Sequence, residues 1–506
     1  MILAIALIYF AVLIVGAGLI TMRQVKSSGD FTTGTGTGGM SWIVVCTTFV
    51  LIPLGSGHSM SLWEMATVGG MGAGALLWAI AVGAIFLPIM MLFLGPIARN
   101  TGYKTFPEIT KAMYGRAFGW FHAAVSTSSM SGIIAAELIG TGVAIYTLSG
   151  GALSLTPAII IAFIFALLYI FFGGILQMAW INIVNSIMLI IGSFAAVAGT
   201  VIWVTKNVAN GMDGIMDYYK NSDMGGGYLN QYTNALQPTT ILSIIIPVAL
   251  MHLCAIAVSQ GHNIPFFAAK SNKAIRKGVY LAGVINAMSA VPWVLIGVIA
   301  FALPAVMSTI APEEVGKLIV PAAALMMLPK PLTGLLMISL LSATLSTAGS
   351  ITLGSAQLMT TNIIKDALFP KMSDKHELLL TRVMCIVYLL VCLFMALNLP
   401  VIMPVFFFCF MLNIPLFFCY ITGMFITINK VTCNLTLIAG YIVAFWWTFV
   451  PPANVPYPFN DTTWAVIAVS FIFGFLLPII LKKQGKMSLN QMIKVSRGQA
   501  EARIAD

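Results

Sequence analysis

Long apolar stretches separated by short polar segments make up most of this 506-residue chain. Each stretch approaches the twenty or so residues that a helix needs to cross about 30 Å of hydrocarbon. Hydrophobic residues account for 59% of the sequence and charged residues for 8%, so we predict an all-α polytopic membrane protein. The pattern predicts thirteen transmembrane helices, at residues 1–22, 41–67, 71–97, 118–149, 156–173, 180–205, 240–259, 277–303, 332–365, 379–398, 401–428, 433–451 and 463–482.

Basic residues are distributed unequally between the two sides of this predicted topology. With the N-terminus outside, 21 of the 25 Lys and Arg residues fall in inner segments, and only four lie outside: Lys206, Lys220, Lys317 and Lys330. The positive-inside rule therefore predicts a multi-pass protein of the cell (plasma) membrane with its C-terminus in the cytoplasm. The longest predicted loops, 206–239 and 304–331, then lie outside. No basic residue precedes the first apolar segment, which favours a retained helix over a cleaved signal peptide.

The second predicted span contains residues that interrupt helices. Pro53, Gly55 and Gly57 lie in its middle, where they would free backbone carbonyls and amides from the helix. Such a break is tolerated only where it lines a cavity or packs against protein, and in transporters it supplies carbonyl oxygens to ions. A packing kink is the alternative. Pro247 and Gly261 interrupt the seventh span more weakly, and a separation of five spans fits two five-helix repeats of inverted topology.

The ninth predicted span, 332–365, carries hydroxyl groups along one side. Five of them lie in or beside one narrow arc of the helix: Ser339, Ser342, Ser346, Thr347 and Ser350. One interpretation is that they join two helices by hydrogen bonds. The other is a cation site, because neutral oxygens clustered inside a protein can replace the water shell of a weakly charged hard cation. The adjacent pair Ser346 and Thr347, one turn beyond Ala343, favours the cation site.

Two carboxylates, Glu64 and Glu137, fall within predicted spans. A charge at membrane depth costs about 2.5 to 3.5 kcal/mol on insertion scales, so each is a functional candidate. The alternatives are a position near an interface, or a protonated side chain tied to a neighbouring helix. His58 and His252 are the intramembrane residues expected to pair with them, although a lone histidine is more often structural.

Four segments of the chain resemble motifs of one transporter family. They are 172–180 (FGGILQMAW), 103–115 with Thr105, Pro107 and Glu108, 267–277 beginning FAAKS, and 343–365. In this order and spacing they resemble the sodium/solute symporter family, which includes sugar, proline and pantothenate carriers. The resemblance implies a LeuT-like fold of two inverted five-helix repeats with an extra N-terminal helix. Three features depart from the family pattern: Ile181-Asn182, Asn185 and Pro265.

The resemblance also implies a division of the chain into units. Residues 1–40 would form the extra N-terminal helix and a cytoplasmic linker, and 41–205 the first repeat. An extracellular loop at 206–239 would precede the second repeat at 240–428. Two C-terminal helices at 429–482 and a cytoplasmic tail at 483–506 would complete the chain.

Site residues follow from the same registration. A sodium ion would bind the carbonyl oxygens of Gly57, Met60 and Ala343 and the hydroxyls of Ser346 and Thr347. Ser59, Glu64 and His252 would line the substrate cavity, and Glu137 joins them because of its position inside a span.

We therefore expect a secondary active transporter, not an enzyme, which couples inward sodium movement to uptake of a small polar organic solute. An amino acid or a similar nitrogenous metabolite is slightly favoured. The alternatives are a proton-coupled carrier of the same fold, using Glu64 or Glu137, and a membrane solute sensor that does not transport. The expected partners are the solute and the lipid bilayer; the formal charge of +10 reflects topology and anionic lipid, not nucleic acid. The oligomeric state does not follow from the sequence.

Overall fold

The computed structural model describes residues 2–34, 38–70, 72–221, 238, 241–398, 403–425, 430–450, 458, 461–480 and 494–495. These ranges are helical, and within them the only β contact is an isolated bridge between Met40 and Ala269. The first half contains α1 (Ile2–Thr21), α2 (Ser28–Thr32), α3 (Trp42–Leu51), α4 (Ser56–Ala66), α5 (Ala75–Ala81), α6 (Leu87–Ile89), α7 (Gly95–Asn100), α8 (Phe106–Tyr114), α9 (Arg116–Ser149), α10 (Leu155–Phe171), α11 (Gly174–Asn207) and α12 (Gly211–Asn221). The second half contains α15 (Ile246–Val258), α16 (Gln260–Phe267), α17 (Asn272–Phe301), α18 (Pro304–Met307), α19 (Val315–Met327), α20 (Lys330–Gln357), α21 (Asp374–Asn398), α22 (Met403–Met411), α23 (Ile414–Phe425), α24 (Lys430–Phe449), α25 (Thr462–Phe471) and α26 (Leu477–Ile480).

Shorter helical turns of other geometry connect or extend these helices. The 3₁₀ turns are Gly72–Gly74 and Pro312–Glu314. The π-type turns are Val82–Phe86, Met90–Leu94, Ile241–Ile245, Leu358–Lys365 and Ile472–Leu476. The first two of these link α5, α6 and α7 into one long span, and Leu358–Lys365 extends α20.

The predicted all-α membrane architecture is confirmed. In the described ranges, ten helices are long and apolar enough to cross a membrane. Shorter apolar helices, Trp42–Leu51, Leu155–Phe171 and Ile246–Val258, lie in the three remaining predicted spans. The exact count of thirteen, and the division into two inverted repeats, therefore stay predictions.

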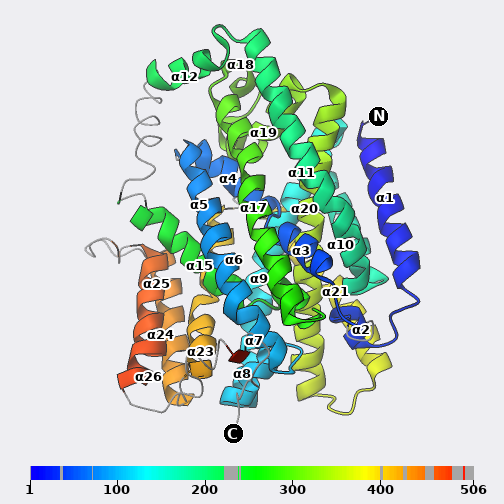
Figure 1. Ribbon diagram of the computed structural model, residues 1–506, viewed down its shortest axis with the longest axis vertical. Helices are drawn as coiled ribbons and strands as arrows, with labels where there is room; N and C mark the ends of the chain where they lie inside the picture. The colour runs from blue at the N-terminus through cyan, green and yellow to red at the C-terminus, as the bar shows by residue number, and fades with distance from the viewer. Residues whose placement is uncertain are drawn as a thin grey trace.

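The helices are arranged as a bundle whose long axis runs between two ends (Figure 1). We call them the α18 end, where α12 and α18 lie, and the α8 end, where α7 and α8 lie. The helix α1 lies along one edge of the bundle with its start toward the α18 end, whereas α26 lies at the α8 end. The most apolar windows of α9 and α20 are 94% and 89% buried, compared with 28% for α1. The hydroxyls of α20 therefore face protein, not lipid.

Three of the predicted spans are broken. In the second, α3 ends at Leu51 and α4 begins at Ser56, which places the break at the proline and glycine noted in the sequence. The seventh divides at Ser259, whose extended backbone separates α15 from α16. The break between α22 and α23, at Leu412 and Asn413, was not predicted. There the Asn413 side chain donates to Ser129 Oγ at 3.0 Å and to the Cys409 carbonyl at 3.1 Å.

Two segments predicted as loops contain helices. The expected loop 304–331 contains α18 and α19, and α19 packs against α4, α9 and α17. The expected loop 206–239 contains α12, although residues 222–237 lie outside the described ranges, as does most of the predicted tail, 483–506. All three helices are amphipathic or short, so a search for long apolar runs did not detect them.

Two of the segments that carry the family resemblance serve as caps in this fold. Thr105 and Glu108 form a capping box at the start of α8, in which each side chain accepts from the backbone N–H of the other. Gln177 accepts from the backbone N–H groups of Phe172 and Gly173 at 3.2 and 2.9 Å. Beside it, Gly174 has a φ of 54° and leaves room for the Phe31 carbonyl, which a side chain would displace. These motifs therefore stabilise turns at the α8 end.

Candidate functional site

The break between α3 and α4 faces the hydroxyls of α20. The Thr347 hydroxyl lies 2.9 Å from the Ile52 carbonyl oxygen, 3.1 Å from that of Leu51 and 3.1 Å from that of Ala343. We call these four oxygens the oxygen cluster. The Thr347 hydroxyl has one proton and three carbonyl oxygens within reach, and the Leu51 carbonyl also accepts from the Leu54 N–H at 3.2 Å. A set of neutral oxygens of this kind suits a hard cation.

Two further hydroxyls of α20 are buried near this cluster. The side chains of Ser342 and Ser346 are fully buried; Ser346 lies beside the Tyr169 hydroxyl, and Ser342 Oγ has no hydrogen-bond partner in the part of the chain that the structure describes. Ser339 and Ser350 differ, because Ser339 donates to the Met188 carbonyl at 2.8 Å and Ser350 to the Gly261 carbonyl at 2.6 Å. The hydroxyls along this side of α20 therefore join helices at both ends of the row, at Ser339 and Ser350, and include an unpaired oxygen, that of Ser342, between them.

Among the residues expected at the sodium site, Thr347 and Ala343 are in direct contact. Ala343 and Thr347 meet the carbonyls of Leu51 and Ile52, whereas the Gly57 carbonyl accepts from Ser61 Oγ at 2.5 Å, and Met60 lies inside α4. Sequence reasoning missed Leu51 and Ile52, because a backbone carbonyl leaves no trace in residue identity. Their position immediately before Pro53 is the one available signal, since a helix usually ends at or before the residue preceding a proline, and the carbonyls of its last turn then lack their usual intrahelical partners.

Glu137 holds the start of α4. Its side chain is 1% exposed, and its Oε1 accepts from the Gly57 N–H at 3.0 Å. A carboxylate is favoured there by the unpaired amides and the dipole at a helix N-terminus. Gly55 and Gly57 allow this approach, since a Cβ on Gly55 would clash with the Glu137 carboxylate. Glu137 therefore supplies a protein anion at a position where a half-helix could bind an anionic substrate group.

Five rings from four helices meet in the interior. They are His58 of α4, Trp78 of α5, His252 of α15, and Phe406 and Phe410 of α22, and we call them the ring cluster. Trp78 lies 4.9 Å from His58 and 5.2 Å from His252, measured between ring centroids. His252 lies 5.8 Å from Phe406 and 4.6 Å from Phe410. Sequence reasoning named the two histidines but missed the other three rings, for which the phenylalanine-rich run at 406–410 is the available signal.

His252 does not form the pair with a carboxylate that we expected. Its Nδ1 lies 2.8 Å from the Val248 carbonyl, and its Nε2 has no partner among the described residues. Because a carbonyl only accepts, Nδ1 carries a proton and Nε2 of the neutral ring is an acceptor. The histidine therefore presents an acceptor to the ring cluster.

Ser59 and Glu64 lie elsewhere on α4. The Ser59 hydroxyl donates to the Leu54 carbonyl at 3.2 Å and so bridges the break from within. Glu64 lies toward the other end of α4 against Gly316 of α19, and the neighbouring Trp63 donates to the Gly316 carbonyl at 2.7 Å. Glu64 interacts electrostatically with Lys317. Of the four expected substrate residues, Ser59 and Glu64 lie on α4, Glu137 on α9 and His252 on α15, and Glu137 and the His252 neighbour Phe406 both lie beside Gly57.

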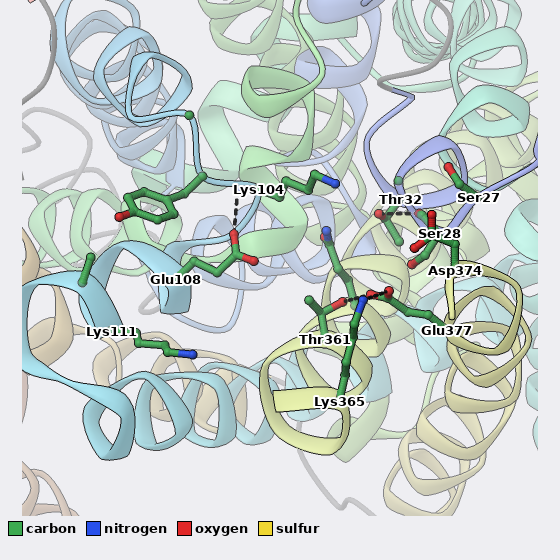
Figure 2. Close-up of a pocket in the computed structure, with 15 residues that line it drawn as sticks. Ser27, Ser28, Thr32, Lys104, Glu108, Lys111, Thr361, Lys365, Asp374 and Glu377 are labelled. Carbon is green, nitrogen blue, oxygen red and sulfur yellow. Dashed lines mark hydrogen bonds and ion pairs between the residues drawn. The ribbon is translucent and has the colours of Figure 1, made fainter. Parts of the chain in front are cut away.

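A cavity of about 650 Å³ opens at the α8 end. Figure 2 shows Glu108 and Lys111 on one wall and Thr361, Lys365 and Glu377 on the other. Glu377 accepts from Lys365 Nζ at 2.5 Å and from Thr361 Oγ1 at 2.8 Å. Gln357, in the last turn of α20, also lines the cavity.

Gln260, at the break between α15 and α16, is hydrogen-bonded to two residues that line this cavity, Lys104 and Gln357. Its Nε2 donates to Gln357 Oε1 and to the Lys104 carbonyl, both at 3.0 Å, and its Oε1 accepts from the Phe106 N–H at 3.2 Å. This amide therefore joins a broken span, α20 and the start of α8. Sequence reasoning missed it, because a single Gln in an apolar span carries no motif.

The arrangement can be compared with known proteins. A sequence profile described as "Sodium:solute symporter family" matches residues 34–412. The chain belongs to this family. Among curated proteins, this family member is similar to an uncharacterized symporter, YwcA, of Bacillus subtilis (strain 168), with 23% identity over 275 residues. That match covers 53% of this chain and 52% of the relative, and so spans about half the length of the curated protein.

Two solved structures share the fold. A Na⁺-coupled sialic acid symporter in a substrate-bound, outward-open state aligns with a TM-score of 0.75 at 15% identity, covering 96% of this chain and 99% of that one. A nucleobase-cation-symport-1 family transporter in a closed conformation with bromovinylhydantoin bound aligns with a TM-score of 0.56 at 14% identity, covering 92% and 97%. At such identities the likeness shows the fold of the family member, and its cargo has to be argued from its own residues.

Proposed function

We propose that the protein is a secondary active transporter in which sodium entry drives uptake of a small polar organic solute by alternating access. The observation that carries the proposal is the oxygen cluster, where Thr347 of α20 meets the carbonyls that end α3. Family membership supports sodium as the co-transported ion. An amino acid or similar nitrogenous metabolite remains the favoured solute.

Sodium would bind between two elements that can move relative to each other. The oxygens of Leu51 and Ile52 belong to the first half of a broken span, and those of Ala343, Ser346 and Thr347 belong to α20. A cation that contacts both favours the state in which they lie close together. Coupling requires that the ion bind this state more tightly than the other. For the solute, Ser59, Glu64, His252 and Glu137 remain the proposed contacts.

The proposal can be tested with purified protein and proteoliposomes. We expect millimolar Na⁺ to raise the Tm in detergent, and an inward Na⁺ gradient to drive uptake of a solute identified by thermal-shift screening. K⁺ and choline at equal ionic strength are the matched controls. Equal stabilisation and uptake in K⁺ would contradict sodium coupling.

Proton coupling through Glu137 is the second candidate, favoured by the buried carboxylate at the start of α4. In that case an inward proton gradient without Na⁺ would drive uptake, and Glu137→Gln would abolish the proton dependence. Under sodium coupling, the same variant would keep its Na⁺ dependence.

The proposed orientation places the α8 end in the cytoplasm and the N-terminus outside the plasma membrane. A cysteine at position 273, near the α8 end, should react with an impermeant thiol reagent only after permeabilisation. A cysteine at exposed Glu313 should react from outside in intact cells. The seven native cysteines are all buried, which keeps background labelling low. Labelling of 273 in intact cells would reverse the orientation.

A further inference from the structure

Two buried polar atoms in the ring cluster lack partners. Trp78 is fully buried and His252 is 2% exposed, and neither Trp78 Nε1 nor His252 Nε2 has a hydrogen-bond partner in the described part of the chain. An unpaired buried polar group costs about 1 to 3 kcal/mol. Such groups need an explanation, and a ligand that pairs with them is one.

The two atoms are chemically complementary yet do not pair with each other. An indole N–H only donates, whereas Nε2 of His252 accepts because Nδ1 donates to Val248. The two rings lie edge to face, with centroids 5.2 Å apart and planes inclined at 64°. One buried donor and one buried acceptor therefore lie on neighbouring rings of the cluster.

The surroundings of these atoms are aromatic. The ring centroids of Phe406 and Phe410 lie 4.6 Å apart. The His252 centroid lies 5.8 Å from that of Phe406 and 4.6 Å from that of Phe410. Ring pairs at such distances favour flat partners that can take the place of one of the rings. The rings come from separate elements, two of which, α4 and α15, are halves of broken spans, and α22 is half of a third. Movement of any of these halves would open a slot between the rings.

A carboxyl group lies beside the cluster and disfavours an anionic solute when it is ionised. Glu137 already occupies the N-terminus of α4, and a Cβ on Gly57 would lie 2.9 Å from the Phe406 ring and 3.1 Å from Glu137 Oε1. The carboxylate is therefore next to the ring cluster. A solute carboxylate would be repelled there, whereas a neutral ring would not.

We propose that the ring cluster is the recognition site for a flat, neutral nitrogen heterocycle with a lactam group. Its carbonyl accepts from Trp78 Nε1, its N–H donates to His252 Nε2, and its faces pack against Phe406 and Phe410. This assignment rests on the proposed transport function and specifies the class of solute.

Three small probes separate the features of such a solute. The compound 2-pyridone is flat with one donor and one acceptor, N-methyl-2-pyridone lacks the donor, and 2-piperidone keeps both groups but is puckered. Binding to the full-length protein in Na⁺ is measured by ligand-observed NMR titration. We expect 2-pyridone to bind about tenfold more tightly than N-methyl-2-pyridone, which is the effect of one lost hydrogen bond of about 1.4 kcal/mol. It should also bind more tightly than 2-piperidone, whose puckered ring packs less closely against aromatic faces. Proline and glucose should not displace it.

Variants then assign the atoms. Trp78→Phe should weaken 2-pyridone binding about tenfold, and His252→Phe should abolish the preference for 2-pyridone over its N-methyl analogue. Trp293→Phe is the matched control, because it also removes a buried, unpaired indole N–H, in α17 beside Trp63. Stabilisation by Na⁺ without solute reports correct folding of each variant. Unchanged binding in Trp78→Phe, or a retained preference in His252→Phe, would overturn the proposal.

The probe titration is decisive even where a variant does not fold. If 2-piperidone, proline or glucose binds more tightly than 2-pyridone, the heterocycle assignment is wrong. The proposed transport function is tested separately, since its failure would appear as absent Na⁺ stabilisation while 2-pyridone still binds.

Discussion

The oxygen cluster and the ring cluster both include residues of the broken second span but differ in the groups that they offer to a ligand. The oxygen cluster is formed by three backbone carbonyls and one hydroxyl, all of them neutral oxygens. The ring cluster is formed by aromatic side chains with one unpaired donor and one unpaired acceptor. The first suits a hard cation and the second a flat organic solute. A broken helix can thus serve two ligands, with its first half exposing carbonyls and its second half carrying side chains.

The two clusters also differ in how they join distant parts of the chain. The oxygen cluster needs only α3 and α20, whereas the ring cluster combines α4, α5, α15 and α22. Glu137 lies near both clusters. It accepts from the Gly57 N–H at the start of α4, and it also lies beside Phe406 of the ring cluster. Perturbing one cluster while leaving the other intact therefore tests whether they act separately.

The largest effect is expected from removing the hydroxyls of the oxygen cluster. Ser346→Ala combined with Thr347→Ala should raise the Na⁺ concentration needed for half-maximal uptake about 100-fold, because two ligands worth about 1.5 kcal/mol each are lost. Binding of 2-pyridone at saturating Na⁺ should change little. The control is Ser339→Ala on the same face of α20, where the hydroxyl joins helices. A double variant with wild-type Na⁺ dependence would show that the ion binds elsewhere.

Glu64→Gln tests whether the solute path extends from the ring cluster toward α19. If Glu64 contacts the solute, affinity should fall by about 1.5 to 3 kcal/mol while the empty protein keeps its Tm and its Na⁺ response. A purely structural Glu64 would lower the Tm about equally with and without solute. Glu313→Gln, an exposed carboxylate before α19, is the matched control. Unchanged affinity in well-folded Glu64→Gln would leave Glu137 as the carboxylate to examine.

Gly55→Ala tests the close approach between the break in the second span and the Glu137 carboxylate. The backbone of Gly55 has a φ of −54°, which alanine also adopts, so the cost is steric and arises from the Glu137 carboxylate. We expect a loss of about 1 to 3 kcal/mol in stability, measured as a lower Tm. Gly16→Ala in α1 is the control, because an added Cβ there meets nothing within 4 Å. Equal Tm values for the two variants would argue against the contact.

The smallest effect is expected at Asp366, outside both clusters. Partial burial raises its pKa, but hydrogen bonds from Lys111, Trp120 and Arg116 outweigh burial and hold the pKa below its usual range. Such a group stabilises the fold above the pKa of an unfolded Asp, near 3.9, and the contribution is lost as the pH falls through the lower, folded value. Asp366→Asn should therefore reduce stability at pH 7 by about 1 kcal/mol or less, since Lys111 and Arg116 are open to water. The difference in Tm between the wild type and Asp366→Asn should therefore be smaller at pH 3.5 than at pH 7.

Much of the fold follows from local sequence. The apolar runs predicted the helices because burial in lipid acts on each segment separately, and Pro53 with Gly55 predicted the break between α3 and α4 because both act on their own backbone. The amphipathic α19 was missed because the apolar runs identify only segments long enough to span the membrane, and its 13 residues are too short. The pair Ser346 and Thr347 stood out because two adjacent hydroxyls in an apolar helix are unusual.

The composition of the two clusters was decided by tertiary structure alone. Leu51 and Ile52 lie about 295 residues from Thr347 in sequence, and Gly57 lies 80 residues from Glu137. Hydropathy and residue type do not specify which carbonyl a hydroxyl will meet, nor that Trp78 and His252 lie edge to face with both polar atoms unpaired. Those relations arise when helices pack, because packing brings together side chains from elements that have no local sequence relationship.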